Sequence, residues 1–136
     1  MGDGMSDTAR VTVEGEIGAK PEVLLPAGDP PAELLIHDLI EGEGAAVQPG
    51  ASVNTHYVGI GWNTKRQFDS SWDRGQPLRF SLTGVIAGWQ QGIPGMKVGG
   101  RRLLVIPADL AYGRTPPPGS GIGSGEALVF VIDLLG

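Results

Sequence analysis

The stretch VIAGWQQGIPGMKVGGRRLLVIPADLAYG, residues 85–113, decides the fold. Its first part predicts a short helix over about Val85–Ile93, because apolar side chains recur there at helical spacing on one face. The three that share this face are Ile86, Trp89 and Ile93. Two glycines inside the segment each cost a helix up to about 1 kcal/mol relative to alanine. So short a helix is not stable alone in water, and it has to be held by a surface packed on its apolar face.

That surface is predicted by the segments around the helix. The same stretch turns at glycines and continues as an apolar strand over residues 101–106. Residues 51–61 alternate in the manner of a strand, with Val53, Thr55 and Tyr57 on one face. Further β-rich segments cover residues 34–40, 67–71, 77–82 and 128–135. The expected fold class is α+β, a twisted antiparallel sheet of about five strands (a half-barrel) wrapped around one short helix.

Composition limits the possible classes of protein. A chain of 136 residues with 40% hydrophobic and 18% charged residues suits one globular domain. The absence of cysteine excludes disulfides, thiolate nucleophiles and cysteine-based metal sites. Apolar runs are far shorter than the roughly 20 residues of a membrane span. The polar N-terminus has no secretory pattern, so a cytoplasmic location is expected.

Charge divides the chain unevenly. The net charge of −5 combines −8 over residues 1–46 with +3 over the remainder. Residues 1–32 are therefore expected to be an acidic, proline-punctuated leader, partly disordered, in which the segment 10–14 forms either an edge strand or nothing regular. The domain proper is expected over residues 33–136. No stripe of lysine and arginine interleaved with aromatic residues is present, so nucleic-acid binding is not expected.

Three further segments complete the pattern: HYVGIGW (residues 56–62), QFDSSWDRGQPLRFSL (67–82) and ALVFVIDLL (127–135). Together with residues 85–113, and in this order, they resemble the FK506-binding-protein family of peptidyl-prolyl cis-trans isomerases over roughly residues 33–136. The resemblance implies an enzyme that accelerates X-Pro isomerisation in peptides and unfolded proteins and so assists folding. It also implies binding of the macrolides FK506 and rapamycin, no cofactor or metal, and a monomer. The alternative is a non-catalytic proline-recognition or chaperone module on the same fold.

The resemblance also implies a set of site residues. Trp89 matches the floor of the family's pocket, and an Asp69 carboxylate matches its polar wall, with Arg74 and the Tyr57 hydroxyl as partners. The Ile86 N–H and the Tyr112 hydroxyl match donors to ligand carbonyl groups. The candidate catalytic residues are Tyr57, Phe68, Asp69, Trp89, Tyr112 and Phe130, and the candidate ligand-binding residues are Arg74, Leu78, Val85, Ile86 and Ile122.

Each of these residues has an ordinary explanation when taken alone. Aromatic residues in strands, and a tryptophan on an apolar helix face, are usually core. Asp69, which precedes two serines, suits a turn or a helix cap, and Arg74 suits an ordinary basic residue on the surface. The two histidines, His37 and His56, are expected to be ordinary strand residues, since neither has ligand-like neighbours. The joint spacing of the candidates favours a site over a generic core.

The sequence departs from the family's pattern in three places. Leu78 stands where an aromatic residue is often found, and Thr83-Gly84 lacks an acidic residue often present before Val85. The loop over residues 114–126, RTPPPGSGIGSGE, differs most and contains three consecutive prolines. These departures are expected to affect substrate preference and drug affinity more than basic activity.

Overall fold

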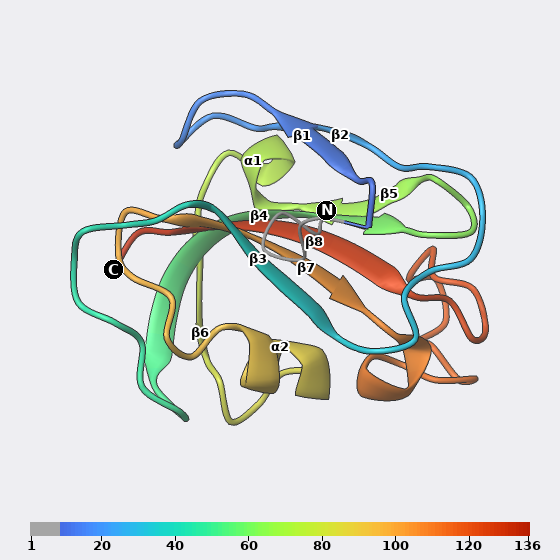
Figure 1. Ribbon diagram of the computed structural model, residues 1–136. Coiled ribbons are helices and arrows are strands. Elements are labelled where there is room, and N and C mark those ends of the chain that lie inside the picture. Colours follow the sequence, from blue (N-terminus) through green and yellow to red (C-terminus); the bar gives the residue numbers. More distant parts are fainter. Residues whose placement is uncertain (1–8) are drawn as a thin grey trace.

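The computed structural model describes residues 9–136 (Figure 1). Eight strands, two short α-helices and one turn of 3₁₀ helix follow one another along these residues. In chain order they are β1 (Thr12–Glu14), β2 (Glu22–Leu24), β3 (Leu35–Ile40), β4 (Ser52–Gly61), β5 (Gln67–Ser70), α1 (Ser71–Arg74), β6 (Leu78–Ser81), α2 (Ala87–Gly92), β7 (Arg101–Ile106), the 3₁₀ turn η2 (Ala108–Leu110) and β8 (Leu128–Leu134).

Six strands form one antiparallel sheet in the order β3-β7-β8-β4-β5, with β6 also paired to β4. β4 organises it, because its first half pairs with β6, its second half with β5, and most of its other edge with β8. β7 and β8 are buried along their whole length, as expected for central strands covered on both faces. The sheet is open, and its six strands exceed the five or so expected from the sequence.

The helix α2 packs on one face of the sheet and is shorter than the span predicted from the sequence. Its two glycines explain both its weak intrinsic propensity and its position. A Cβ atom at Gly88 would lie 2.4 Å from Ile106 Cγ2, and one at Gly92 would lie 2.8 Å from Leu104 Cδ2. The glycines thus let the helix backbone approach β7 closely, and tertiary packing compensates for the poor helix propensity. Trp89 and Ile93 are buried in the core between helix and sheet.

The opposite face of the sheet is covered by the hairpin β1–β2 and by α1 (Figure 1). Val11 is 4% exposed and packs in a second apolar cluster with residues of β4, β7 and β8. Val23 and Leu25 pack partly buried against the same cluster. Val11, Val23 and Leu25 thus pack against the sheet, although they lie in the segment 1–32 that is expected to be a leader. That part of this leader is disordered stays a prediction. Residues 1–8 lie outside the described part of the chain.

The short helix α1 is not predicted from the sequence. Ser70 caps it, its hydroxyl oxygen accepting the Asp73 N–H at 3.2 Å, and Gly75 ends it in the left-handed conformation at φ 80°. These are ordinary start and stop signals for a helix, but one turn carries no apolar periodicity to reveal it. Within residues 9–136, no helix is long and apolar enough to cross a membrane.

Candidate active site

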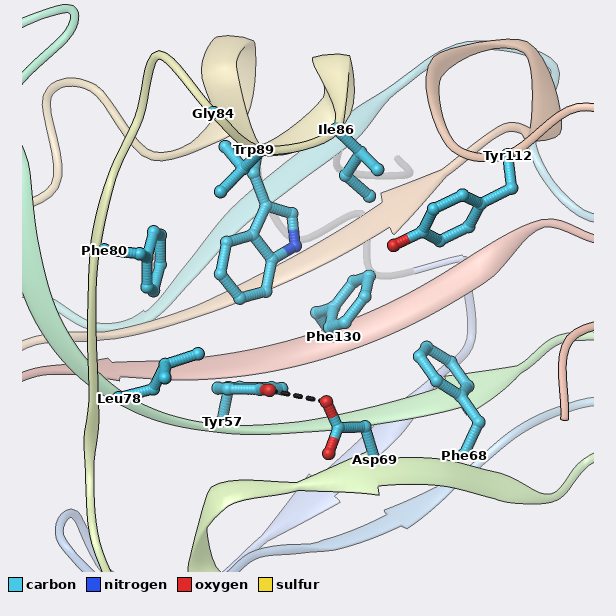
Figure 2. A pocket seen from close by; sticks show the side chains of 11 residues that line it. Tyr57, Phe68, Asp69, Leu78, Phe80, Gly84, Ile86, Trp89, Tyr112 and Phe130 are labelled. Atoms are coloured by element: carbon cyan, nitrogen blue, oxygen red, sulfur yellow. Dashed lines mark hydrogen bonds between the residues drawn. The ribbon is translucent and has the colours of Figure 1, made fainter. Parts of the chain in front are cut away.

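A cavity of about 460 Å³ opens between α2, the sheet and the connecting loops (Figure 2). Its size lies in the range typical of small-ligand sites, and its walls are mainly apolar and aromatic. The residues that line it are Tyr57, Phe68, Asp69, Leu78, Phe80, Gly84, Val85, Ile86, Trp89, Tyr112 and Phe130. Residues from four strands, from α2 and the segment before it, and from the loop after η2 therefore meet at one place.

Trp89 stands at the centre of the aromatic part of the cavity. Its ring centroid lies 4.9 Å from that of Phe80, 5.0 Å from Phe130 and 5.3 Å from Tyr57. Its pairs with Phe130 and Tyr57 are edge-to-face, an arrangement that the charge distribution of aromatic rings favours. The indole Nε1 is buried and has no hydrogen-bond partner in the described chain. The floor of the cavity is therefore an aromatic surface that carries one buried N–H donor.

Gly59 makes the wall beside this floor possible. It lies on β4 opposite Phe130 in the register with β8. A Cβ atom there would meet Phe68 Cζ at 2.6 Å and Phe130 Cε1 at 2.8 Å. Because glycine has no side chain, the two phenyl rings close over it with centroids 5.6 Å apart. Any larger residue at this position would force these rings to shift.

One wall is polar. The Tyr57 hydroxyl donates to Asp69 Oδ2 at 2.5 Å (Figure 2). Arg74 donates through Nη2 to the Tyr57 hydroxyl oxygen at 3.1 Å and through Nη1 to Asp69 Oδ1. Burial raises the pKa of the Tyr57 hydroxyl above its ordinary value, and the neighbouring Asp69 carboxylate contributes in the same direction. The phenol therefore stays protonated at neutral pH and remains a donor to the carboxylate.

The chain path explains how these three groups meet. Antiparallel pairing of β4 with β5 sets Asp69 opposite Gly59, two positions beyond Tyr57. α1 starts directly after β5, so Arg74 at its end turns back toward Asp69. One strand pair and one helical turn thus build the polar wall.

Most residues predicted from the sequence are brought together by the fold. Of the candidate catalytic residues, all line the cavity, as do Leu78, Val85 and Ile86 of the ligand-binding set. Arg74 contacts the cavity only through Tyr57 and Asp69. Ile122 packs against the core beneath but is not among the lining residues. The roles assigned to these residues stay predictions.

Two lining residues, Phe80 and Gly84, are not among those predicted from the sequence. Phe80 lies on β6 two positions after Leu78, and its ring packs on Trp89. Residues two apart in a strand share a face, so the placement of Leu78 at the pocket edge already pointed to Phe80. Gly84 precedes Val85 and brings only backbone to the cavity; its residue type gave no signal. No group of three or more potential metal-ligating side chains occurs in the 9–136 region.

Comparisons with known proteins show which family this chain belongs to. Residues 43–135 match the sequence profile of the FKBP-type peptidyl-prolyl cis-trans isomerases. The chain belongs to this family. A probable FK506-binding protein of Corynebacterium glutamicum is 58% identical over 117 residues, covering 85% of this chain and 97% of that protein. An FK506-binding protein of Streptomyces anulatus is 54% identical over 118 residues, covering 85% of this chain and 95% of its own length.

Solved structures of this family share the fold. The crystal structure of a peptidyl-prolyl cis-trans isomerase from Pseudomonas syringae superposes with a TM-score of 0.68 at 34% identity, over 76% of this chain and 74% of that one. The matched relatives therefore include proteins named for the catalytic activity itself. The protein is an FKBP-type peptidyl-prolyl cis-trans isomerase, and the open sheet packed on a short helix is the fold of its family.

Proposed function

We propose that the cavity over Trp89 is where this isomerase turns over its substrate, with the proline ring on the indole and the preceding carbonyl near the polar groups of the rim. The observation that carries the proposal is the aromatic floor next to a hydrogen-bonded polar wall. A ring-shaped apolar group fits such a floor, and the Ile86 N–H, ahead of the first turn of α2, has no intrahelical acceptor to compete for it.

The physical basis of catalysis is the resonance of the X-Pro amide. Its barrier of about 18–20 kcal/mol arises from the double-bond character of the C–N bond, and in water the planar form is favoured by solvation of its polarised oxygen. A dry cavity removes part of that solvation, and contacts on the ring and flanking residues can stabilise the twisted form more than the planar one. Asp69 then acts through hydrogen bonds and charge, not as a general base.

The proposed substrates are proline-containing peptides and unfolded polypeptides, and the proposed role in the cell is assistance to folding in the cytoplasm. Uncatalysed X-Pro isomerisation takes tens to hundreds of seconds and can limit folding, so a catalyst of this step serves any unfolded client. FK506 and rapamycin are proposed to bind the same cavity, as the family and the names of its relatives suggest. We also propose that the protein is a monomer.

The experiment is the cis-to-trans rate of a short Leu-Pro-Phe peptide with and without the protein, repeated with excess FK506. We expect the protein to accelerate isomerisation and FK506 to abolish this acceleration, because the peptide and the drug both occupy the cavity over Trp89. Acceleration that persists with FK506 bound would place catalysis outside this cavity. Drug binding without acceleration would favour the recognition-module alternative, in which the same pocket only holds proline segments.

A further inference from the structure

Residues 15–20 of the loop between β1 and β2, called the 15–20 loop below, are fixed by a buried ion pair on the sheet. Arg101 and Asp133 face each other on β7 and β8 and are 2% and 1% exposed. Their side chains form two hydrogen bonds to each other, at 2.6 and 2.9 Å. Buried charges need every donor and acceptor satisfied, and the loop provides the remaining partners.

The remaining partners are backbone groups of the loop. The Arg101 guanidinium donates to the carbonyl oxygens of Gly15, Glu16 and Ala19 at 3.2, 3.0 and 2.7 Å, and the Gly18 N–H donates to Asp133 Oδ2 at 2.8 Å. Hydrogen bonds to charged groups are stronger than neutral ones. The 15–20 loop is therefore attached to the centre of the sheet at several points.

The same loop contacts α1 from the outside. The Gly18 carbonyl accepts the Trp72 Nε1–H at 3.1 Å, and Lys20 Nζ pairs with the Asp73 carboxylate at 2.8 Å. α1 is a single turn of four residues, too short to keep its place by its own hydrogen bonds. Its position is set by what it packs against, and the 15–20 loop is one of those surfaces.

α1 in turn carries groups that reach Tyr57. The Ser71 hydroxyl oxygen accepts the Tyr57 backbone N–H at 2.7 Å, and Arg74 holds the Tyr57 hydroxyl and Asp69. His56, next to Tyr57 on β4, stacks on Trp72 with ring centroids 5.0 Å apart. The contacts thus run without interruption from the loop on the outer face to the polar wall of the cavity.

We propose that the 15–20 loop is a positioning element for the isomerase site, and that Gly18 and Lys20 hold α1 so that Arg74 keeps its contacts with Tyr57 and Asp69. The inference rests on the proposed function of the cavity. It assigns to the N-terminal segment a part in turnover, whereas its charge alone suggested an acidic, partly disordered leader. Arg74 is the link, because its long side chain is 45% exposed and its direction depends on where α1 lies.

The main test is Gly18→Val in the full chain. Gly18 has φ +89°, a conformation that β-branched residues rarely adopt, and a Cβ atom there would meet nothing within 4 Å. The substitution therefore acts on the backbone of the loop and not by a steric clash. The matched control is Gly28→Val, at φ +104° with the same open surroundings. The Gly28 carbonyl also accepts a tryptophan N–H, that of Trp62 at 2.9 Å, but Trp62 is not part of α1.

The expected result is a fall of kcat/KM on the order of ten-fold for Gly18→Val, as small misplacements of site groups cost rate, and no fall for Gly28→Val. The decisive comparison is the Arg74→Met background, in which Gly18→Val should lower kcat/KM no further. If the loop only stabilises the fold, Gly18→Val should lower kcat/KM equally in the wild-type and Arg74→Met proteins, or lower Tm without changing kcat/KM. Either outcome would overturn the proposal.

A second pair of variants covers the case in which Gly18→Val does not fold. Lys20→Met removes the ion pair with Asp73, and Lys97→Met removes the comparably exposed pair with Glu41 on another edge. Lys20→Met should lower kcat/KM, but only in a protein that retains Arg74, whereas Lys97→Met should leave kcat/KM unchanged. Equal effects of the two variants would contradict the proposal.

A titration separates failure of this proposal from failure of the proposed function. The hydrogen bond from Arg74 lowers the pKa of Tyr57 against the upward effects of burial and Asp69, so displacing Arg74 should raise that pKa. With only two tyrosines in the chain, ring-labelled NMR resolves Tyr57 from Tyr112 without any turnover. An unchanged Tyr57 titration in Gly18→Val would refute positioning through Arg74, whether or not the wild-type protein is active.

Discussion

At the scale of single residues, the aromatic groups of the site serve the fold as well as the cavity. Trp89 and Phe130 are 5% and 4% exposed and belong to the main core. Truncating a buried aromatic residue to alanine costs about 3–5 kcal/mol, so loss of activity in such variants would not separate function from folding. The polar wall allows a cleaner test, because Asp69 and Arg74 are partly exposed.

We expect Asp69→Asn to lower kcat/KM with little change in Tm. The substitution keeps the shape of the side chain but removes the charge that accepts hydrogen bonds from Tyr57 and Arg74. Because Arg74 and Asp69 are both partly exposed, solvent screens their ion pair and it contributes little to stability. Loss of about 1.4 kcal/mol of stabilisation of the twisted state lowers kcat/KM about ten-fold. Peptide isomerisation kinetics and a thermal melt check this, with Asp109→Asn outside the cavity as control. Wild-type kcat/KM in the variant would remove Asp69 from the site.

At the scale of elements, the unusual loop over residues 114–126 is fixed by one carboxylate. Glu126 is 2% exposed and accepts three backbone N–H groups, from Gly123 at 2.8 Å, Thr64 at 2.8 Å and Asn63 at 3.0 Å. It thereby joins the end of the loop to the turn between β4 and β5. Burial raises the pKa of Glu126, but these hydrogen bonds outweigh it and hold that pKa below its ordinary value.

We expect Glu126→Gln to lower the free energy of unfolding at pH 7 by about 2 kcal/mol, the size of a hydrogen bond to a charged group. Because the folded-state pKa lies below the unfolded value of about 4.5, the contribution of the carboxylate is present above that pH and is lost as pH falls through the folded-state pKa. The difference in unfolding free energy between the wild type and Glu126→Gln should therefore become smaller at acidic pH. Urea unfolding at several pH values measures it, with the exposed Glu43→Gln as control. A gap independent of pH would show that the charge is not what holds the loop.

At the scale of the whole molecule, the sheet is covered on both faces. α2 closes the face that carries the cavity, and the β1–β2 hairpin with α1 closes the other (Figure 1). The family profile begins at residue 43, whereas the apolar packing begins by Val11. We therefore propose that the N-terminal segment unfolds together with the sheet as one cooperative unit.

Val11→Ala tests this cooperativity. Burial of a valine side chain contributes about 1.5–3 kcal/mol, so the loss of most of it should lower the unfolding free energy by about 1–2 kcal/mol while unfolding stays a single transition. The control is Thr12→Ala, because Thr12 is the neighbouring residue and its side chain is exposed. Thermal melts monitored by fluorescence and circular dichroism provide the measurement. Unchanged stability in Val11→Ala would mean that the segment behaves as a separate tail.

The sequence by itself determined the elements whose pattern is local. The alternation in residues 51–61 and the apolar run at 101–106 placed β4 and β7 within a residue or two, because side chains on a strand alternate between faces. Helical spacing around Trp89 likewise placed α2, although the helix begins later than predicted. These local periodicities can be recognised without knowing which distant segments of the chain pack against them.

Only the tertiary structure decided which distant groups meet. The one-turn helix α1 and the 15–20 loop have no periodicity of their own and exist through contacts with the sheet, such as those of Arg101 and Asp133. Glu126 accepts hydrogen bonds from Asn63 and Thr64, which lie in the turn after β4, about 60 positions earlier in the sequence. Such contacts depend on strand order and register, which follow from the packing of the whole chain and not from any short segment of it.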